Sequence, residues 1–87
     1  MKIKDGFVMK SIAGTDVVMP IGDNMVSFGS VITLNETGVF LWQKLQEETT
    51  QEKLVSEMLK EYNVDEATAE SDVAEFVNKL HEVGLLV

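Results

Sequence analysis

The sequence contains neither cysteine nor arginine, and it has one proline and one histidine among its 87 residues. Without cysteine there is no disulfide bond, thiol nucleophile or thiolate metal site. Without arginine the chain lacks the side chain that best forms paired hydrogen bonds to phosphate and guanine. No apolar run approaches the roughly 18 residues that a membrane-spanning helix needs, and no charged-then-apolar leader opens the chain. We therefore expect a soluble, cytoplasmic protein with no membrane partner.

The charge is concentrated in the second part of the chain. Residues 1–35 carry three lysines and three aspartates, whereas residues 36–87 carry four lysines and twelve acidic residues. The net charge of −8 therefore lies entirely in the second part. An acidic surface repels a polyphosphate backbone, so we expect no nucleic-acid partner.

The composition is that of an ordinary globular protein, with 45% apolar and 25% charged residues. No linker, repeat or low-complexity tract divides the chain, and its length suffices for a single modest core. We expect one domain over residues 1–87, with a β meander over 1–35 and a helical part over 36–87.

The first part has the pattern of an antiparallel sheet. The segments Phe7–Ile12 and Asp16–Ile21 are short, apolar and rich in branched side chains, and "AGT" between them predicts a turn. Pro20 cannot donate a ladder hydrogen bond and should lie at a strand end or on an edge. A third segment, Met25–Leu34, is interrupted at Gly29–Ser30, where the pattern predicts a bulge.

The second part predicts three helices. Asn35 is a favourable N-cap for the first helix, and "TTQE" (Thr49–Glu52) matches a capping box that opens the second. Asn63 should end the second helix in the left-handed conformation, Asp65 should cap the third, and Gly84 should end it. A small three-stranded antiparallel sheet followed by three helices predicts an α+β domain of winged-helix-like architecture.

The sequence offers little material for catalysis or metal binding. His81 is the only histidine, and no second ligand type lies three or four residues from it. Neither a Gly-rich phosphate loop nor a nucleophile elbow is present. The acidic residues have the pattern of a solvated face. We expect no enzymatic activity, no metal and no cofactor.

The uncharged segment Val31–Leu34 has two interpretations. An exposed sheet edge favours aggregation unless it is covered, charged or used. The segment is either buried between the other strands and the helices, or it is a docking edge to which a partner peptide adds a strand. The residues that the second interpretation assigns to peptide binding are Phe28, Val31, Ile32, Thr33 and Leu34.

The third predicted helix offers a second contact surface. If Val73, Phe76 and Leu80 face the core, the neighbouring flank of this helix is free for a partner. The small Ala74 would leave a groove there, and Glu70 would attract a basic peptide residue. The alternative is an ordinary helix side with one alanine and one valine by chance. The flank nominated by this pattern consists of Glu70, Ala74, Val77 and His81.

Gly38 lies in the first turn of the first predicted helix, where alanine would be more stable by about 1 kcal/mol. Either its missing side chain lets this turn pack closely against the sheet or the third helix, or the gap leaves room for an incoming peptide.

Several motifs together resemble one family. "TLNETGVFLW" resembles the L-N-E-T-G-x-x-[LI]-[LW] stretch of PqqD-like proteins, the small peptide chaperones named for pyrroloquinoline quinone biosynthesis. "GFVMKSIAGTDVVMPIG" is similar to the opening hairpin of the family, and the segment from "TTQEKL" to "HEVGLL" is similar to its two closing helices. The resemblance covers nearly the whole chain.

This resemblance implies a recognition element for ribosomally synthesised, post-translationally modified peptides (a RiPP recognition element). Such domains are not catalytic. They bind the leader segment of a precursor peptide, which joins the sheet against the third strand and contacts the third helix. They present it to a modifying enzyme, often a radical SAM protein. Carried onto this sequence, the resemblance places the docking strand at Val31–Leu34, together with Phe28, and the helix contacts within Asp72–His81.

Two other hypotheses belong to different classes. The first is a winged-helix protein-interaction or transcription-regulator-like domain, which acts through protein contacts or has its DNA binding supplied by a partner. The second is a structural subunit that forms a homodimer by continuous sheet pairing through a free edge.

Overall fold

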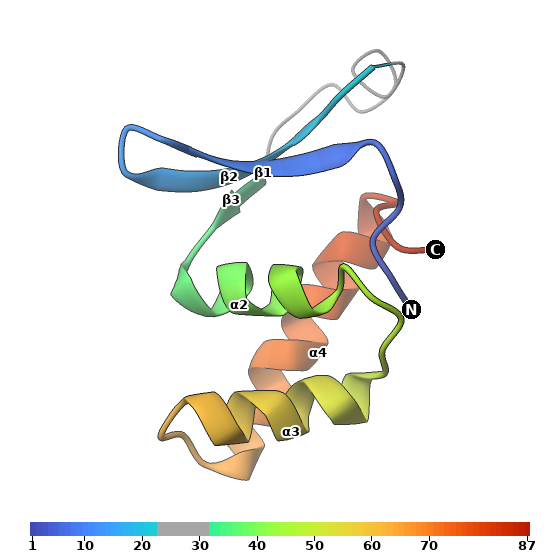
Figure 1. Cartoon of the computed structure of the whole chain (residues 1–87). Coiled ribbons are helices and arrows are strands. Elements are labelled where there is room, and N and C mark those ends of the chain that lie inside the picture. The colour runs from blue at the N-terminus through green and yellow to red at the C-terminus, as the bar shows by residue number, and fades with distance from the viewer. Residues whose placement is uncertain (23–31) are drawn as a thin grey trace.

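The computed structural model describes residues 1–22 and 32–87 of the chain. In these residues an antiparallel three-stranded sheet is followed by three helices, which confirms the predicted α+β order (Figure 1). The elements are β1 (Phe7–Ile12), β2 (Thr15–Pro20), β3 (Ile32–Leu34), α2 (Glu36–Lys44), α3 (Gln51–Glu61) and α4 (Glu66–Glu82).

A two-residue turn joins β1 to β2. Ala13 and Gly14 both have positive φ angles, 52° and 79°, as a type I′ turn requires. The twist of this turn matches that of the flanking strands, so the strands pair from Phe7↔Pro20 to Ile12↔Thr15. Pro20 is the last residue of β2, as predicted.

The strand order is β1-β2-β3, so β3 is bonded to β2 on one side. The pairs Asp16↔Leu34 and Val18↔Ile32 set its register. Ile32 and Leu34 are buried and Thr33 between them is exposed, as expected for a strand with one face on the core. Residues 25–31 of the longer predicted segment, with its bulge, lie outside the described residues.

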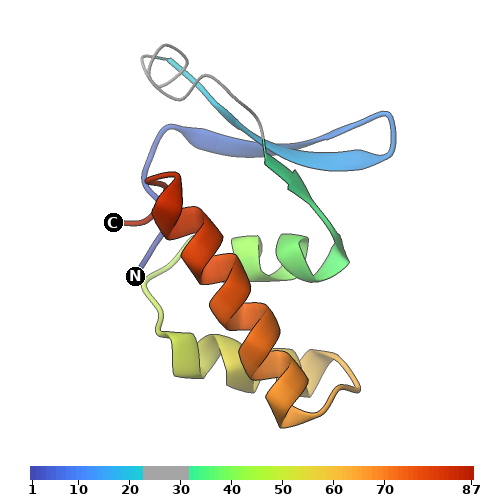
Figure 2. The same cartoon turned by 180° about the vertical axis from the view of Figure 1, so that it is seen from behind.

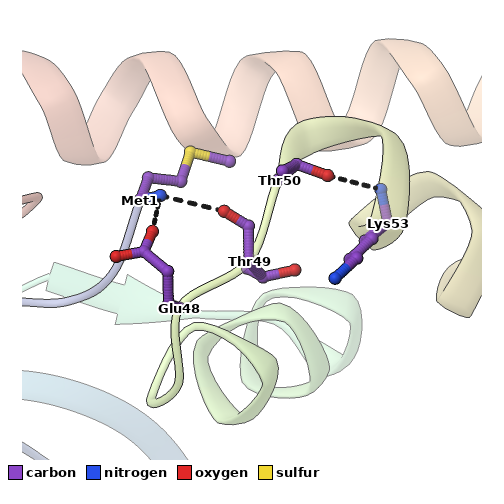
Figure 3. Close-up of polar contacts among 5 residues, drawn as sticks. All are labelled: Met1, Glu48, Thr49, Thr50 and Lys53. Atoms are coloured by element: carbon purple, nitrogen blue, oxygen red, sulfur yellow. Dashed lines mark hydrogen bonds and ion pairs between the residues drawn. The ribbon is translucent and has the colours of Figure 1, made fainter.

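Side-chain caps fix the starts of α2 and α3. The Gly38 N–H donates to Asn35 Oδ1 at 2.9 Å, which confirms Asn35 as the N-cap of α2. The α3 cap is Thr50, whose Oγ1 accepts from the Lys53 N–H at 3.2 Å. The capping box predicted to begin at Thr49 is therefore wrong by one residue, because the backbone of Thr49 pairs with Met1 instead (Figure 3).

The ends of α3 and α4 differ from one another. Gly84 has a φ of 76° and ends α4 in the predicted left-handed conformation. Ala13 is the one non-glycine residue with positive φ within residues 1–22 and 32–87, so the left-handed conformation predicted for Asn63 is wrong. Tyr62 caps α3 in an extended conformation.

Asp65 precedes α4 as predicted, but its carboxylate accepts from the Thr68 hydroxyl rather than from a backbone N–H.

The core lies between one face of the sheet and the three helices. Figure 1 shows α2 below the sheet, and Figure 2 shows α4 crossing in front of α2 with its C-terminal end near the sheet. The fully buried side chains from strands, helices and the C-terminal segment meet in a single cluster. Its innermost members are Val18, Leu41, Leu45, Leu54, Met58, Val73, Leu80 and Leu85.

The two ends of the chain pair with each other beside the core. Ile3 and Leu86 form an antiparallel bridge, and the Lys4 N–H donates to the Leu85 carbonyl at 2.8 Å. The Met1 ammonium is paired with the Glu48 carboxylate and donates to the Thr49 carbonyl at 2.9 Å (Figure 3). Both interactions tie the N-terminus to the α2–α3 connection. The helices of the described residues are too short or too polar for any of them to cross a bilayer.

Candidate functional site

The free edge of β3 borders a groove in the surface. β3 occupies one end of the strand order, and its edge opposite β2 is not paired with any strand of the described residues. A hollow of about 390 Å³ lies beside it, between β3, the start of α2 and one flank of α4. Its lining residues are Ile32, Thr33, Leu34, Asn35, Thr37, Gly38, Leu41, Asp72, Glu75, Phe76 and Lys79.

The two walls of this groove differ in chemistry. All the lining residues contributed by β3 and α2 are uncharged. The α4 wall carries the half-buried ring of Phe76 between three charged side chains, Asp72, Glu75 and Lys79. An extended peptide placed here would find free backbone groups on one wall and side-chain contacts on the other.

Gly38 lies where the strand wall meets the first turn of α2, and it is buried. A Cβ at this position would be 3.1 Å from Asn35 Oδ1 and 3.4 Å from the Leu34 side chain. Asn35 Oδ1 is held in place, because it accepts hydrogen bonds from both Gly38 and Thr37. These contacts favour close packing as the explanation of this glycine, and its position also lines the groove.

The strand residues that the sequence predicts to bind a peptide line the groove, as far as the structure describes them. Ile32, Thr33 and Leu34 all line it. Phe28 and Val31 lie outside the described residues. Binding of a peptide by these five residues stays a prediction, with three of them at a surface suited to it.

The α4 residues that the sequence predicts to bind a peptide lie on the flank of the helix that faces away from the groove. The residues concerned, Glu70, Ala74, Val77 and His81, do not line the groove. Val77 is 8% exposed and belongs to the core cluster, so its predicted place outside the core is wrong. Phe76, expected in the core, is half-buried and lines the groove.

The helix period explains why the predicted positions of Phe76 and Val77 are interchanged. Successive residues are about 100° apart around a helix, so Phe76 and Val77 lie on opposite margins of the apolar stripe. The period reveals the stripe but not which of its margins faces the sheet. The pattern missed four lining residues of α4, which are Asp72, Glu75, Phe76 and Lys79. They have the spacing of one helix flank and lie within the segment Asp72–His81 that the family resemblance indicated.

A second hollow, of about 680 Å³, lies on the other side of the β3–α2 junction. Leu34 and Asn35 line both hollows. The Tyr62 ring in the second hollow meets the Phe40 ring edge-on, with centroids 5.4 Å apart. Burial, together with the nearby carboxylates of Glu36 and Glu61, raises the pKa of the Tyr62 hydroxyl.

Within residues 1–22 and 32–87, no group of three or more histidine, cysteine, aspartate or glutamate side chains is placed to hold a metal ion. The one histidine, His81, is exposed near the end of α4.

The comparison with known proteins identifies the family. The model of the family described as coenzyme PQQ synthesis protein D (PqqD) matches residues 11–86. The chain belongs to the PqqD family. This membership confirms the resemblance carried by the "LNETG" and hairpin motifs, and it extends over nearly the whole domain.

Two solved structures share the fold. TbiB1, in complex with the TbiA(beta) leader peptide, is 30% identical with a TM-score of 0.77, and the match covers 99% of this chain and 94% of TbiB1. Lasso peptide synthetase B1, complexed with the leader peptide, is 23% identical with a TM-score of 0.72, covering 97% and 93% of the respective chains. None of the curated protein sequences matches this PqqD-family chain.

Proposed function

We propose that this PqqD-family domain binds the leader segment of a ribosomally synthesised precursor peptide and presents it to a modifying enzyme. The observation that carries the proposal is the free, uncharged edge of β3 beside a groove whose opposite wall is α4. Family membership and the leader-peptide complexes of two similar structures support it.

Strand addition accounts for the binding. A leader segment bonded to the free edge of β3 extends the sheet by one strand, and its backbone groups replace hydrogen bonds to water. Alternate side chains of an extended peptide point to the same face. Those that point towards α4 would contact Phe76 and its charged neighbours. The backbone supplies affinity that depends little on sequence, and α4 supplies selectivity.

The role of this domain is non-catalytic in the proposal. It holds the leader while another protein modifies the rest of the precursor, and we propose a radical SAM enzyme as that partner. Affinity capture from the native cell extract tests the partnership. The expected result is recovery of a short precursor peptide together with a modifying enzyme, and recovery of neither would contradict it.

Titration of isotope-labelled protein with the leader of the captured precursor tests the binding site. The amides of Ile32, Thr33 and Leu34 and those of the groove flank around Phe76 should shift, along with Phe28 and Val31 if the predicted strand extends that far. The β1–β2 turn at Ala13–Gly14 serves as an internal control that should not move. Saturation without shifts at β3 would contradict strand addition.

A further inference from the structure

Among the residues that the structure describes, all the charged side chains that line the groove come from α4. Asp72 and Glu75 are three residues apart and Lys79 is four residues beyond Glu75, so the three are neighbours along one flank of the helix. Asp72 is half-buried at the groove, whereas Glu75 and Lys79 are exposed. Two negative charges are therefore adjacent, with one positive charge about a turn further on.

No ion pair among the described residues involves these three charges. Within residues 1–22 and 32–87, the ion pairs join Met1 to Glu48 and Glu57 to Lys44 and Lys60. None involves Asp72, Glu75 or Lys79, although Glu75 and Lys79 have a spacing that favours a pair on an isolated helix. A charged side chain of a bound peptide could therefore pair with them without breaking an existing ion pair.

We propose that the groove selects leader peptides by charge, taking one basic side chain between Asp72 and Glu75 next to an apolar residue that packs on Phe76. This inference rests on the proposed function. A single cation can contact both carboxylates, because residues three apart on a helix are only about 5–6 Å apart at Cβ. The apolar ring of Phe76 on the same flank offers the adjacent contact.

Lys79 supplies the repulsive element. Specificity needs unfavourable interactions with wrong partners as well as favourable ones with the right partner. A second basic residue placed towards the C-terminal end of α4 would meet the Lys79 ammonium. The combination favours one position of a peptide along β3 over a position shifted by two residues, which backbone hydrogen bonds alone cannot distinguish.

Selection from a random library of short linear peptides, displayed on phage, tests this inference. The wild type should enrich peptides with a basic residue at a fixed distance from an apolar one. The Asp72→Asn/Glu75→Gln variant should enrich peptides with the apolar residue but without the basic preference. The control, Glu47→Gln/Glu52→Gln, removes the same amount of charge from exposed positions away from the groove and should select as the wild type does.

Affinities of resynthesised peptides make the test quantitative. Replacing the selected basic residue with glutamine should weaken binding to the wild type roughly 3- to 20-fold, and to the groove variant by less than about two-fold. Thermal unfolding checks that all variants are folded.

The outcomes separate two failures. Selected peptides that shift the β3 amides but show no basic preference, or lose it equally in the control variant, would overturn charge selection and leave the proposed function standing. Failure to select any peptide that shifts those amides would count against the proposed function itself.

Discussion

The two flanks of α4 look alike in sequence and differ in their surroundings. Each carries at least one acidic residue and has an apolar side chain at the margin of the buried stripe, Phe76 on one flank and Val77 on the other. The Phe76 flank faces the groove beside β3, whereas the Val77 side chain is buried in the core. Position relative to a free sheet edge, rather than composition, therefore marks the flank suited to bind a peptide.

The largest effect on binding is expected for Phe76→Ala. This change removes the one aromatic side chain that lines the groove among residues 1–22 and 32–87. Because truncation of a central aromatic anchor costs about 2 kcal/mol or more, leader affinity should fall by roughly 30-fold. Titration with a labelled leader peptide measures it, and unchanged affinity in a folded variant would break the distinction between the flanks.

The substitution of the next residue, Val77→Ala, should lower stability and leave leader affinity nearly unchanged. Val77 is 8% exposed and packed in the core, so losing two methyl groups should lower the free energy of unfolding by roughly 1–3 kcal/mol. Affinity measured on the folded protein should stay within about two-fold of the wild type. Urea unfolding and peptide titration of the same sample give both quantities. A loss of affinity larger than that of Phe76→Ala would assign binding to the Val77 flank.

Gly38→Ala tests the wall of the groove opposite α4. The added Cβ would be 3.1 Å from Asn35 Oδ1, which two hydrogen bonds hold in place. We expect a loss of about 1 kcal/mol of stability, because this crowding outweighs the better helix propensity of alanine. The affinity of the folded variant should change little, since the Cβ faces Leu34 and Asn35. Lost affinity at unchanged stability would show instead that the glycine leaves room for the peptide.

The smallest effect is expected for Glu48→Gln, far from both flanks in sequence. The hydrogen bond and charge of the N-terminal ammonium lower the pKa of the Glu48 carboxyl, which is exposed. A carboxyl group whose pKa is lowered in the folded protein stabilises the fold at pH values above its ordinary pKa. This stabilisation is lost as the pH falls through the lowered pKa. Thermal unfolding should show a slightly lower Tm for the variant at neutral pH, and no difference in strong acid. A change in leader affinity would contradict the expectation that this contact lies apart from the peptide groove.

Local signals predicted most of the fold. The "AGT" turn and the Asn35 cap depend on neighbouring residues, and the structure confirms both of them. The predicted cap of α3, Thr49, is wrong by one residue. Met1, which is distant in sequence, forms hydrogen bonds with the Thr49 backbone. Local patterns carry no information about such a contact.

Without the family resemblance, the candidate groove was predictable on its strand side only. An uncharged β segment that leads directly into a capped helix pointed to Val31–Leu34, and the structure places its described part, Ile32–Leu34, at the edge of the sheet. The α4 side depends on how that helix crosses the sheet, which is a property of the tertiary packing of α4 on α3 and on the core. The hydrophobic period is the same whichever margin faces the groove.

Nuclear Overhauser contacts between a bound, unlabelled leader peptide and the isotope-labelled domain test the central claim most directly. Strand addition at β3 predicts contacts from the peptide backbone to Ile32–Leu34 and from its side chains to the Phe76 ring. Contacts to Ala74 and His81, or to the outer edge of β1, without any to β3 would contradict it.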